Sequence, residues 1–87
     1  MSRIFRATAV ATSTVLMEQV GDHIEVKVQL DILGMLFTAP RKFSTIGEAS
    51  HWHEYLVTAL QGMARLHGLS DEARSLRVSE KEEEGDR

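Results

Sequence analysis

The sequence has no cysteine, a single proline and few aromatic residues. The absence of cysteine excludes a disulfide framework, a cysteine-based zinc site and a thiol nucleophile. It is also typical of a reducing compartment, and we expect a cytoplasmic protein. No apolar run approaches the roughly 20 residues of a membrane span. Arg6, Thr8 and Thr12 interrupt the apolar N-terminal stretch, unlike the core of a signal peptide. We therefore expect no membrane contact.

Clustered cations are missing as well. The chain has 10 basic and 13 acidic residues, for a net charge of −3. The segment 79–87 carries this whole excess, so the rest of the chain is neutral and its cations are scattered. Neutralising phosphates requires clustered lysine and arginine, so nucleic acid is not an expected partner. A length of 87 residues accommodates one domain, which we place at residues 1–78, followed by a flexible acidic tail at 79–87.

The clearest pattern in the chain is a strict alternation over residues 24–32. Its apolar members are Ile24, Val26, Val28, Leu30 and Ile32. Its polar members are Glu25, Lys27, Gln29 and Asp31. A spacing of two predicts a half-buried strand, with the even-numbered side chains facing a core and the odd-numbered ones facing solvent.

A hairpin turn is predicted directly before this strand. Gly21 and Asp22 separate two β-rich runs, and glycine at the first central position suits a type II′ turn. A two-residue loop places residues 15 and 17 on the core face, opposite residues 28 and 26. It also places Glu18 opposite Glu25 on the solvent face. A three-residue loop would instead turn Glu18 toward the core, and we favour the shorter loop.

Two further segments are interpreted as strands. Residues 4–12 alternate weakly and are rich in alanine, threonine and valine. Gly34 predicts a turn that returns residues 35–43 as another strand. Because Pro40 lacks an amide hydrogen, this strand lies at an edge of the sheet or ends near the proline. The expected sheet is an antiparallel meander of three or four strands.

The hydrophobic period changes near residue 45, where Thr45 and Glu48 have the spacing of a capping box. Apolar residues then recur at steps of three and four, which predicts a helix over 46–67 that Gly68 ends as a left-handed cap. The apolar stripe is Ala49, Trp52, Leu56, Ala59, Leu60 and Met63. Ser70 predicts a short second helix through residue 78. The expected fold is α+β: an antiparallel sheet of three to four strands packed by one long helix, with a short C-terminal helix and an acidic tail.

Two histidines, His51 and His53, flank the tryptophan on the long helix. Successive helical residues point about 100° apart, so the two imidazoles diverge and cannot share a metal ion. We interpret both as flanking residues of a half-exposed helix. The serines form no nucleophile elbow, the glycines form no phosphate loop, and no buried acid is predicted. The sequence thus predicts no enzyme activity, no metal, no cofactor and no small-molecule substrate.

The solvent face of the sheet is the remaining candidate site, because one helix covers only one face of an antiparallel sheet and leaves the other to solvent or to a partner. This face is interpreted either as an ordinary solvated surface or as a mixed-charge docking surface. The candidate partner-binding residues are Glu18, Glu25, Lys27, Gln29 and Asp31. Their mixed signs favour a protein partner over DNA. Edge pairing of the apolar segment 35–38 with its own copy is a second interpretation, so the chain is expected to be a monomer or a homodimer.

The order of these elements resembles that of small phage-encoded anti-CRISPR proteins that inhibit type I-F complexes. The resemblance covers residues 1–68 and is carried by the alternating strand, the segment RKFST at 41–45 and Trp52. It implies an antiparallel sheet beside helices, and inhibition by binding a Cas complex subunit on the surface used for target DNA. That family presents tyrosines from its sheet, whereas the single tyrosine here, Tyr55, is predicted on the helix. No binding residue is therefore transferred.

Two other families share parts of this pattern. The segment RKFSTIGEASHW resembles the arm-binding modules of phage integrases, which implies a small DNA-binding or regulatory module. The alternating charges of the sheet face argue against that interpretation. The strand-then-helix order resembles HicB-type antitoxins, which would bind a toxin. The favoured hypothesis is a non-enzymatic protein-binding inhibitor of phage or mobile-element origin.

Overall fold

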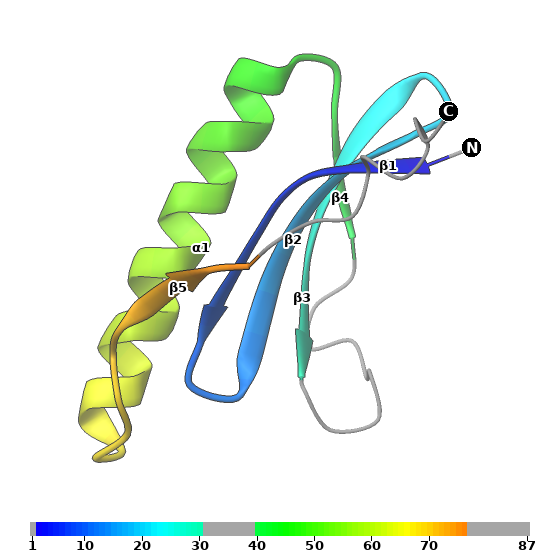
Figure 1. The fold of residues 1–87 in the computed structure, drawn as a ribbon. Coiled ribbons are helices and arrows are strands. Elements are labelled where there is room, and N and C mark those ends of the chain that lie inside the picture. Colours follow the sequence, from blue (N-terminus) through cyan, green and yellow to red (C-terminus); the bar gives the residue numbers. More distant parts are fainter. Residues whose placement is uncertain (1, 31–39, 77–87) are drawn as a thin grey trace.

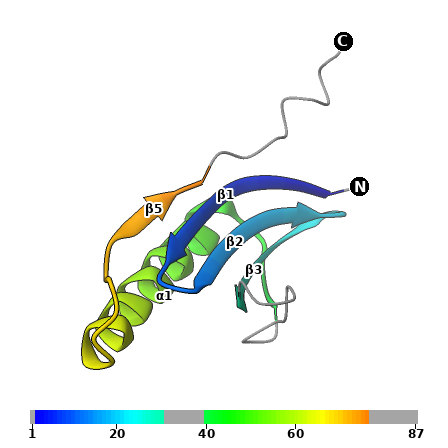
Figure 2. The ribbon, with the colours of Figure 1, turned by 60° about the horizontal axis from the view of Figure 1, so that its bottom comes forward.

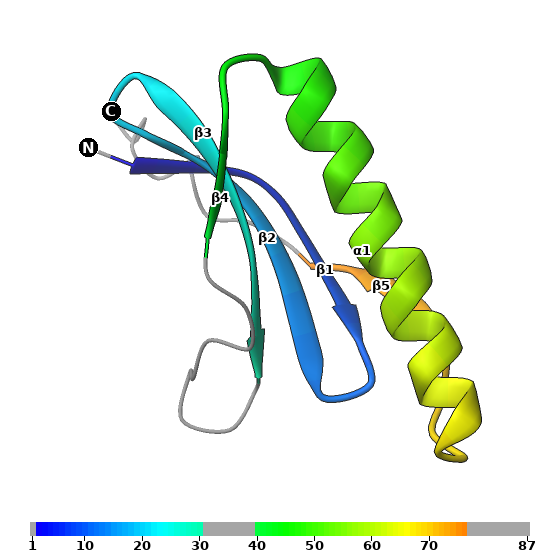
Figure 3. The same cartoon turned by 180° about the vertical axis from the view of Figure 1, so that it is seen from behind.

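The computed structural model of the chain describes residues 2–30 and 40–76. Its elements, in chain order, are β1 Ser2–Val10, β2 Ser13–Val20, β3 His23–Leu30, β4 Arg41–Phe43, α1 Ile46–Leu66 and β5 Ala73–Ser75. The strands form one five-stranded sheet in the order β4-β3-β2-β1-β5, and every pairing is antiparallel. The helix α1 lies across one face of this sheet (Figures 1 and 3). The predicted α+β fold, an antiparallel sheet packed by one long helix, is confirmed.

The hairpin of β2 and β3 has the predicted register. Val15 lies opposite Val28, Met17 opposite Val26, and Glu18 opposite Glu25. Gly21 adopts a positive φ of 64°, which glycine reaches without steric cost, as the predicted type II′ turn requires. The even-numbered residues of β3 from 24 to 28 are buried and their odd-numbered neighbours are partly exposed, so the strand faces the core as expected.

The first strand runs from Ser2 and pairs with β2 along its length, as the weak alternation predicted. Its register shifts between Ile4 and Arg6, where Phe5 is an extra residue. A bulge of this kind re-aims neighbouring side chains. Phe5 packs against the core, and Arg6 forms an ion pair with Glu54 of α1, with 2.7 Å between Nη2 and Oε2. The bulge therefore helps to attach the helix to the sheet.

Of the two edge strands of the sheet, the sequence predicted one and missed the other. At one edge, β4 pairs with β3, and Pro40 lies just outside it, as predicted for an edge strand. The turn predicted at Gly34, residues 35–39 of the predicted strand and the predicted tail at 79–87 lie outside the described residues. At the other edge, β5 pairs with the C-terminal half of β1 and lies beside it in Figures 1 and 2.

The predicted short helix after Ser70 is wrong over the described residues, because this segment forms β5. The Ser70 side chain accepts a hydrogen bond from the amide of Glu72, so it caps a turn that begins no helix. A helix this short is marginal in water, whereas the free edge of β1 offers ready backbone hydrogen bonds. The amide of Leu76 donates to the carbonyl of Ala7 at 2.8 Å. The sheet consequently has five strands, one or two more than predicted.

The limits of α1 agree with the prediction, but its rotation about its own axis does not. Thr45 caps the first turn by accepting a hydrogen bond from the amide of Glu48 at 3.2 Å, and Gly68 follows the last turn with a φ of 72°. The buried helical residues are Ala49, His53, Val57 and Ala64. Of the predicted stripe, Ala49 is buried and Trp52, Leu56 and Leu60 pack partly against the core. Ala59 and Met63 are exposed, which corrects the predicted stripe.

The core lies between α1 and the inner face of the sheet. Its buried members are Val10, Val15, Met17, Ile24, Val26, Val28, Ala49, Val57 and Ala64. Most of them are small or β-branched, so the helix lies close to the strands. Within the described residues, no helix is long and apolar enough to cross a lipid bilayer.

Candidate protein-binding surface

The face of the sheet turned away from α1, here called the open face, consists of cross-strand rows fixed by the register. The first row is Ile4, Glu18, Glu25 and Lys42. The second row is Ala7, Leu16 and Lys27. The third row is Arg74, Ala9, Thr14 and Gln29. Four of the five predicted site residues therefore lie together on this face, and Asp31 lies outside the described residues.

An ion pair and a histidine–carboxylate hydrogen bond order the charged residues of the open face. Glu18 and Glu25 lie opposite each other, but each carboxylate has a different basic neighbour. Lys27 Nζ is 3.1 Å from Glu18 Oε1, and the two side chains are only 21% and 14% exposed. His23 Nε2 is 2.9 Å from Glu25 Oε2. These contacts hold charges of both signs in fixed positions on rigid strands.

An apolar strip lies beside these charges, over β1 and β2. Leu16 is half-buried, with Ala7 on one side and Lys27 on the other. Ala7 and Ala9 are buried although they face away from the helix. An apolar centre bordered by polar groups is the usual organisation of a protein–protein interface. The open face therefore has the composition of a docking surface.

On the helix side of the molecule, the single tryptophan and the single tyrosine stack on each other. The rings of Trp52 and Tyr55 are 5.0 Å apart and nearly parallel, at 18°. The Arg41 guanidinium lies 4.5 Å from the indole and also 5.7 Å from the ring of Phe43. These cation–π contacts tie β4 to α1. Trp52 is half-buried as predicted for a residue laid on the sheet, while Tyr55 is 58% exposed.

The structure corrects the prediction for His53 and agrees with it for His51. His51 is exposed, whereas His53 is only 1% exposed and lies under the helix. Neither ring nitrogen of His53 has a hydrogen-bond partner within the described part of the chain. Burial lowers the pKa of His53 and the nearby Arg6 charge lowers it further, while Glu54 and the Val15 backbone act in the opposite direction. Burial therefore disfavours the protonated, charged form of this ring.

Sequence periodicity did not predict the burial of His53, because histidine is ordinarily a polar residue in such a pattern. Residues 49, 53, 57, 60 and 64 follow helical steps of three and four, and only His53 breaks the apolar pattern. Treating the imidazole as a half-apolar ring would have placed it in the stripe. Among residues 2–30 and 40–76, no three histidine or carboxylate side chains lie close enough together to hold a metal ion.

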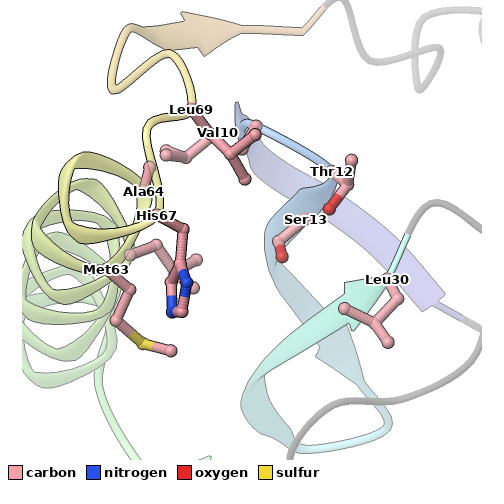
Figure 4. Close-up of a pocket in the computed structure, with 10 residues that line it drawn as sticks. Val10, Thr12, Ser13, Leu30, Met63, Ala64, His67 and Leu69 are labelled. Carbon is pink, nitrogen blue, oxygen red and sulfur yellow. The ribbon is translucent and has the colours of Figure 1, made fainter.

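An apolar groove of about 170 Å³ lies between the C-terminal half of α1 and the ends of β1, β2 and β3 (Figure 4). It is lined by Val10, Ala11, Thr12, Ser13, Leu30, Leu60, Met63, Ala64, His67 and Leu69. In Figure 4, Met63 and His67 of the helix segment lie across from Ser13 and Leu30 of the sheet. Pockets that enclose small-molecule ligands are usually larger, at roughly 300–1,000 Å³, and have several convergent polar groups. This groove therefore fits an apolar side chain better than a polar substrate.

No family model matches this chain, and neither the curated proteins nor the solved structures contain a match to it. Function is therefore inferred from the surfaces described above.

Proposed function

We propose that this chain is a non-enzymatic protein-binding module that docks through the open face of its sheet. The observation that carries the proposal is the pair of Glu18 and Lys27, fixed at 3.1 Å beside the apolar strip of Leu16. Strands hold side chains more rigidly than loops do, so the charges are ordered before a partner arrives. Pre-ordered charges lose little conformational freedom on binding and favour one orientation of the partner.

A protein partner fits this face better than a nucleic acid does. Its cations are Lys27, Lys42 and Arg74, and two carboxylates lie among them. Binding to the phosphates of a nucleic acid depends on cations without nearby acids, because each carboxylate repels the negatively charged phosphate backbone. A protein surface with alternating signs can complement both charges at once.

More specifically, we propose that the chain is an inhibitor of the anti-CRISPR type. Bound through the open face, it would cover the surface on which a CRISPR–Cas complex holds target DNA, in the cytoplasm of a bacterial host. Two features support this form: the resemblance of the strand and helix order to that family, and a folded region of balanced charge. An inhibitor that acts by covering a surface has to bind tightly and to be large enough to block that surface, but it does not have to catalyse a reaction.

The test uses the full chain, a purified type I-F surveillance complex loaded with guide RNA, and labelled target duplex. We expect the chain to bind the complex and to abolish its retention of the duplex in a gel-shift assay. Lys27→Glu is expected to weaken this inhibition at least about tenfold, because it places a third acid beside Glu18 and Glu25.

The matched control exchanges the two charges in one chain, Glu18→Lys with Lys27→Glu. This double variant keeps an ion pair at the same place and should therefore fold as the native chain does, but it reverses the polarity that the partner meets. Loss of inhibition with native stability supports docking through the open face. Full inhibition by the double variant would exclude this face as the docking surface.

Two results would replace the proposal with one of the alternatives. Micromolar binding of the free chain to duplex DNA, with a steep dependence on salt, would indicate a DNA-binding module. Failure to bind the Cas complex, together with neutralisation of a toxin encoded beside this chain, would indicate an antitoxin.

A further inference from the structure

The outer face of α1 is defined by Tyr55, Ala59, Gly62 and Leu66, and the one ring contact of its side chains within the described residues is the stack of Tyr55 on Trp52 of the same helix. Steps of four, three and four place these residues on one side of the helix. Tyr55 is 58% exposed and Leu66 is 84% exposed. An amphipathic helix ordinarily shows charged or polar side chains on such a side, so the bare outer face requires an explanation.

The charges of this part of the helix are engaged elsewhere in the chain. Arg65 is the only charged residue between Tyr55 and Leu66, and its Nη1 lies 2.6 Å from Asp71 Oδ2. Gln61 donates to the backbone carbonyl of Asp71 at 2.9 Å. Glu54 bonds Arg6 of β1. These contacts turn the three side chains toward β1 and toward Asp71, in the segment between α1 and β5, which leaves the outer face uncharged over three turns.

Gly62 packs against no other residue within the part of the chain that the structure describes. A Cβ atom built at this position would meet nothing within 4 Å, and the residue has no positive φ. Glycine in the middle of a helix is unfavourable relative to alanine, so its presence calls for a compensating contact. Together with the neighbouring Ala59, it forms a low point on the helix surface where another backbone could approach closely.

We infer that the outer face of α1 binds a second copy of this chain, with the two helices antiparallel. Ala59 and Gly62 lie at the middle of the face, and Tyr55 and Leu66 are equally far from that middle. A two-fold axis there brings each Ala59 against Gly62 of the second copy. The same axis brings each Tyr55 against Leu66 of the second copy. An isologous interface needs this kind of self-complementary pattern.

The spacing of the four residues is that of a coiled-coil seam, in which successive contacts alternate by four and three residues. Small residues at the crossing let the helix axes approach to about 8 Å, and the bulky pairs close both ends of the contact. The stack on Trp52 already orders the ring of Tyr55, so little freedom is lost on pairing. Without charges, the face offers no electrostatic selection for a different protein, whereas a second copy matches it in shape.

The size of the face indicates a weak dimer. A stable protein interface covers about 800 Å² on each partner, and one side of three helical turns supplies less than that. We therefore expect dissociation in the micromolar range. The two open faces would point outward on opposite sides, because each sheet lies behind its own helix (Figure 1). The dimer would thus present two docking surfaces, a consequence that rests on the proposed function, whereas the pairing itself does not.

Sedimentation equilibrium on the full chain, over concentrations from about 5 to 500 µM, tests the pairing in the range expected for a small interface. The native chain should pass from monomer to dimer. Leu66→Asp should weaken dimerisation at least about 100-fold, because the change occurs twice in a symmetric interface. The matched control is Leu76→Asp, which alters another exposed leucine away from this face and should leave the dimer intact. A native chain that stays monomeric, or an equal effect of both variants, would overturn the inference.

Cross-linking tests the antiparallel arrangement, since the chain has no cysteine of its own. Mixed Tyr55→Cys and Leu66→Cys chains should form disulfide-linked heterodimers on mild oxidation. Tyr55→Cys chains alone should not cross-link, because the two positions would lie roughly 16 Å apart along the helices, at 1.5 Å per residue. Efficient self-linking of Tyr55→Cys would overturn the antiparallel arrangement. A monomeric native chain whose Leu66→Asp variant loses binding to the Cas complex would overturn the pairing, and would show that the chain binds that complex through the outer face of α1 rather than through the open face.

Discussion

The open face of the sheet and the outer face of α1 treat charge in opposite ways. On the sheet, Glu18 pairs with Lys27 and Glu25 pairs with His23, and all four side chains stay on the open face. The open face therefore keeps charges of alternating sign. On the helix from residue 54 to 66, Glu54 bonds Arg6 of β1 and Arg65 bonds Asp71, so the outer face of Tyr55, Ala59, Gly62 and Leu66 is uncharged. The first surface suits a different protein with a complementary field, and the second suits a copy of itself. The difference shows that the pairing of a charge decides the character of a surface more than the number of charges does.

Of the substitutions that test this difference between the two faces, the removal of the tryptophan should cause the largest loss in the free energy of unfolding. Trp52→Ala removes partly buried packing and the support of Tyr55, and we expect a loss of about 3 kcal/mol in the free energy of unfolding. Urea unfolding with an unchanged m-value measures it. The control is Leu66→Asp on the exposed end of the outer face, which should change stability by less than about 0.5 kcal/mol. Equal losses in both variants would mean that the outer face supports the fold and is no free surface.

Breaking a pair on the open face should have a smaller effect. Lys27→Ala leaves the mostly covered Glu18 carboxylate without its cation, and we expect a loss of about 1–2 kcal/mol, well below that of a fully buried pair. Adding Glu18→Gln should recover most of this loss, which a double-mutant cycle measures. Arg65→Ala on the helix breaks an exposed pair and should leave the unfolding midpoint unchanged. A Lys27→Ala chain as stable as the native one would show that the open-face pairs are not fixed.

The pH dependence of stability should be the most gradual of the three effects. The pKa of His53 in the folded chain lies below its ordinary value of 6.5. Below that pH, the imidazole therefore binds more protons in the unfolded chain than in the folded chain. Stability is therefore complete above pH 6.5 and decreases as the pH is lowered from there. Denaturant unfolding between pH 7.5 and pH 5 measures this dependence.

The matched variants are two histidine substitutions on the same helix. His53→Leu keeps a similar volume and should flatten the pH dependence, whereas His51→Ala changes an exposed ring and should leave it as in the native chain. A native slope retained by His53→Leu would assign the pH dependence to another group.

Local patterns predicted much of the candidate site. The alternation of β3 and the turn at Gly21 placed Glu18, Glu25, Lys27 and Gln29 on one face of the sheet, and the structure gathers all four there. The contact between Lys27 and Glu18 was not predicted, because the two residues are not directly opposite in the register. Their pairing depends on how two long side chains bend across a twisted sheet, and no periodicity describes that. The bare outer face was missed for a related reason, since it depends on which partners the charged helical residues find.

The sequence by itself determined the strands of the central hairpin, their register and both ends of α1. Each of these depends on neighbours in the chain: a glycine that permits the turn, a side-chain spacing of two, a threonine that caps a free amide and a glycine that ends the helix. Only the tertiary structure decided the rotation of α1, the burial of His53 and the fifth strand. Those features depend on surfaces that meet only after folding: the side of the helix that fits the sheet, and the edge of β1 that was free to accept another strand.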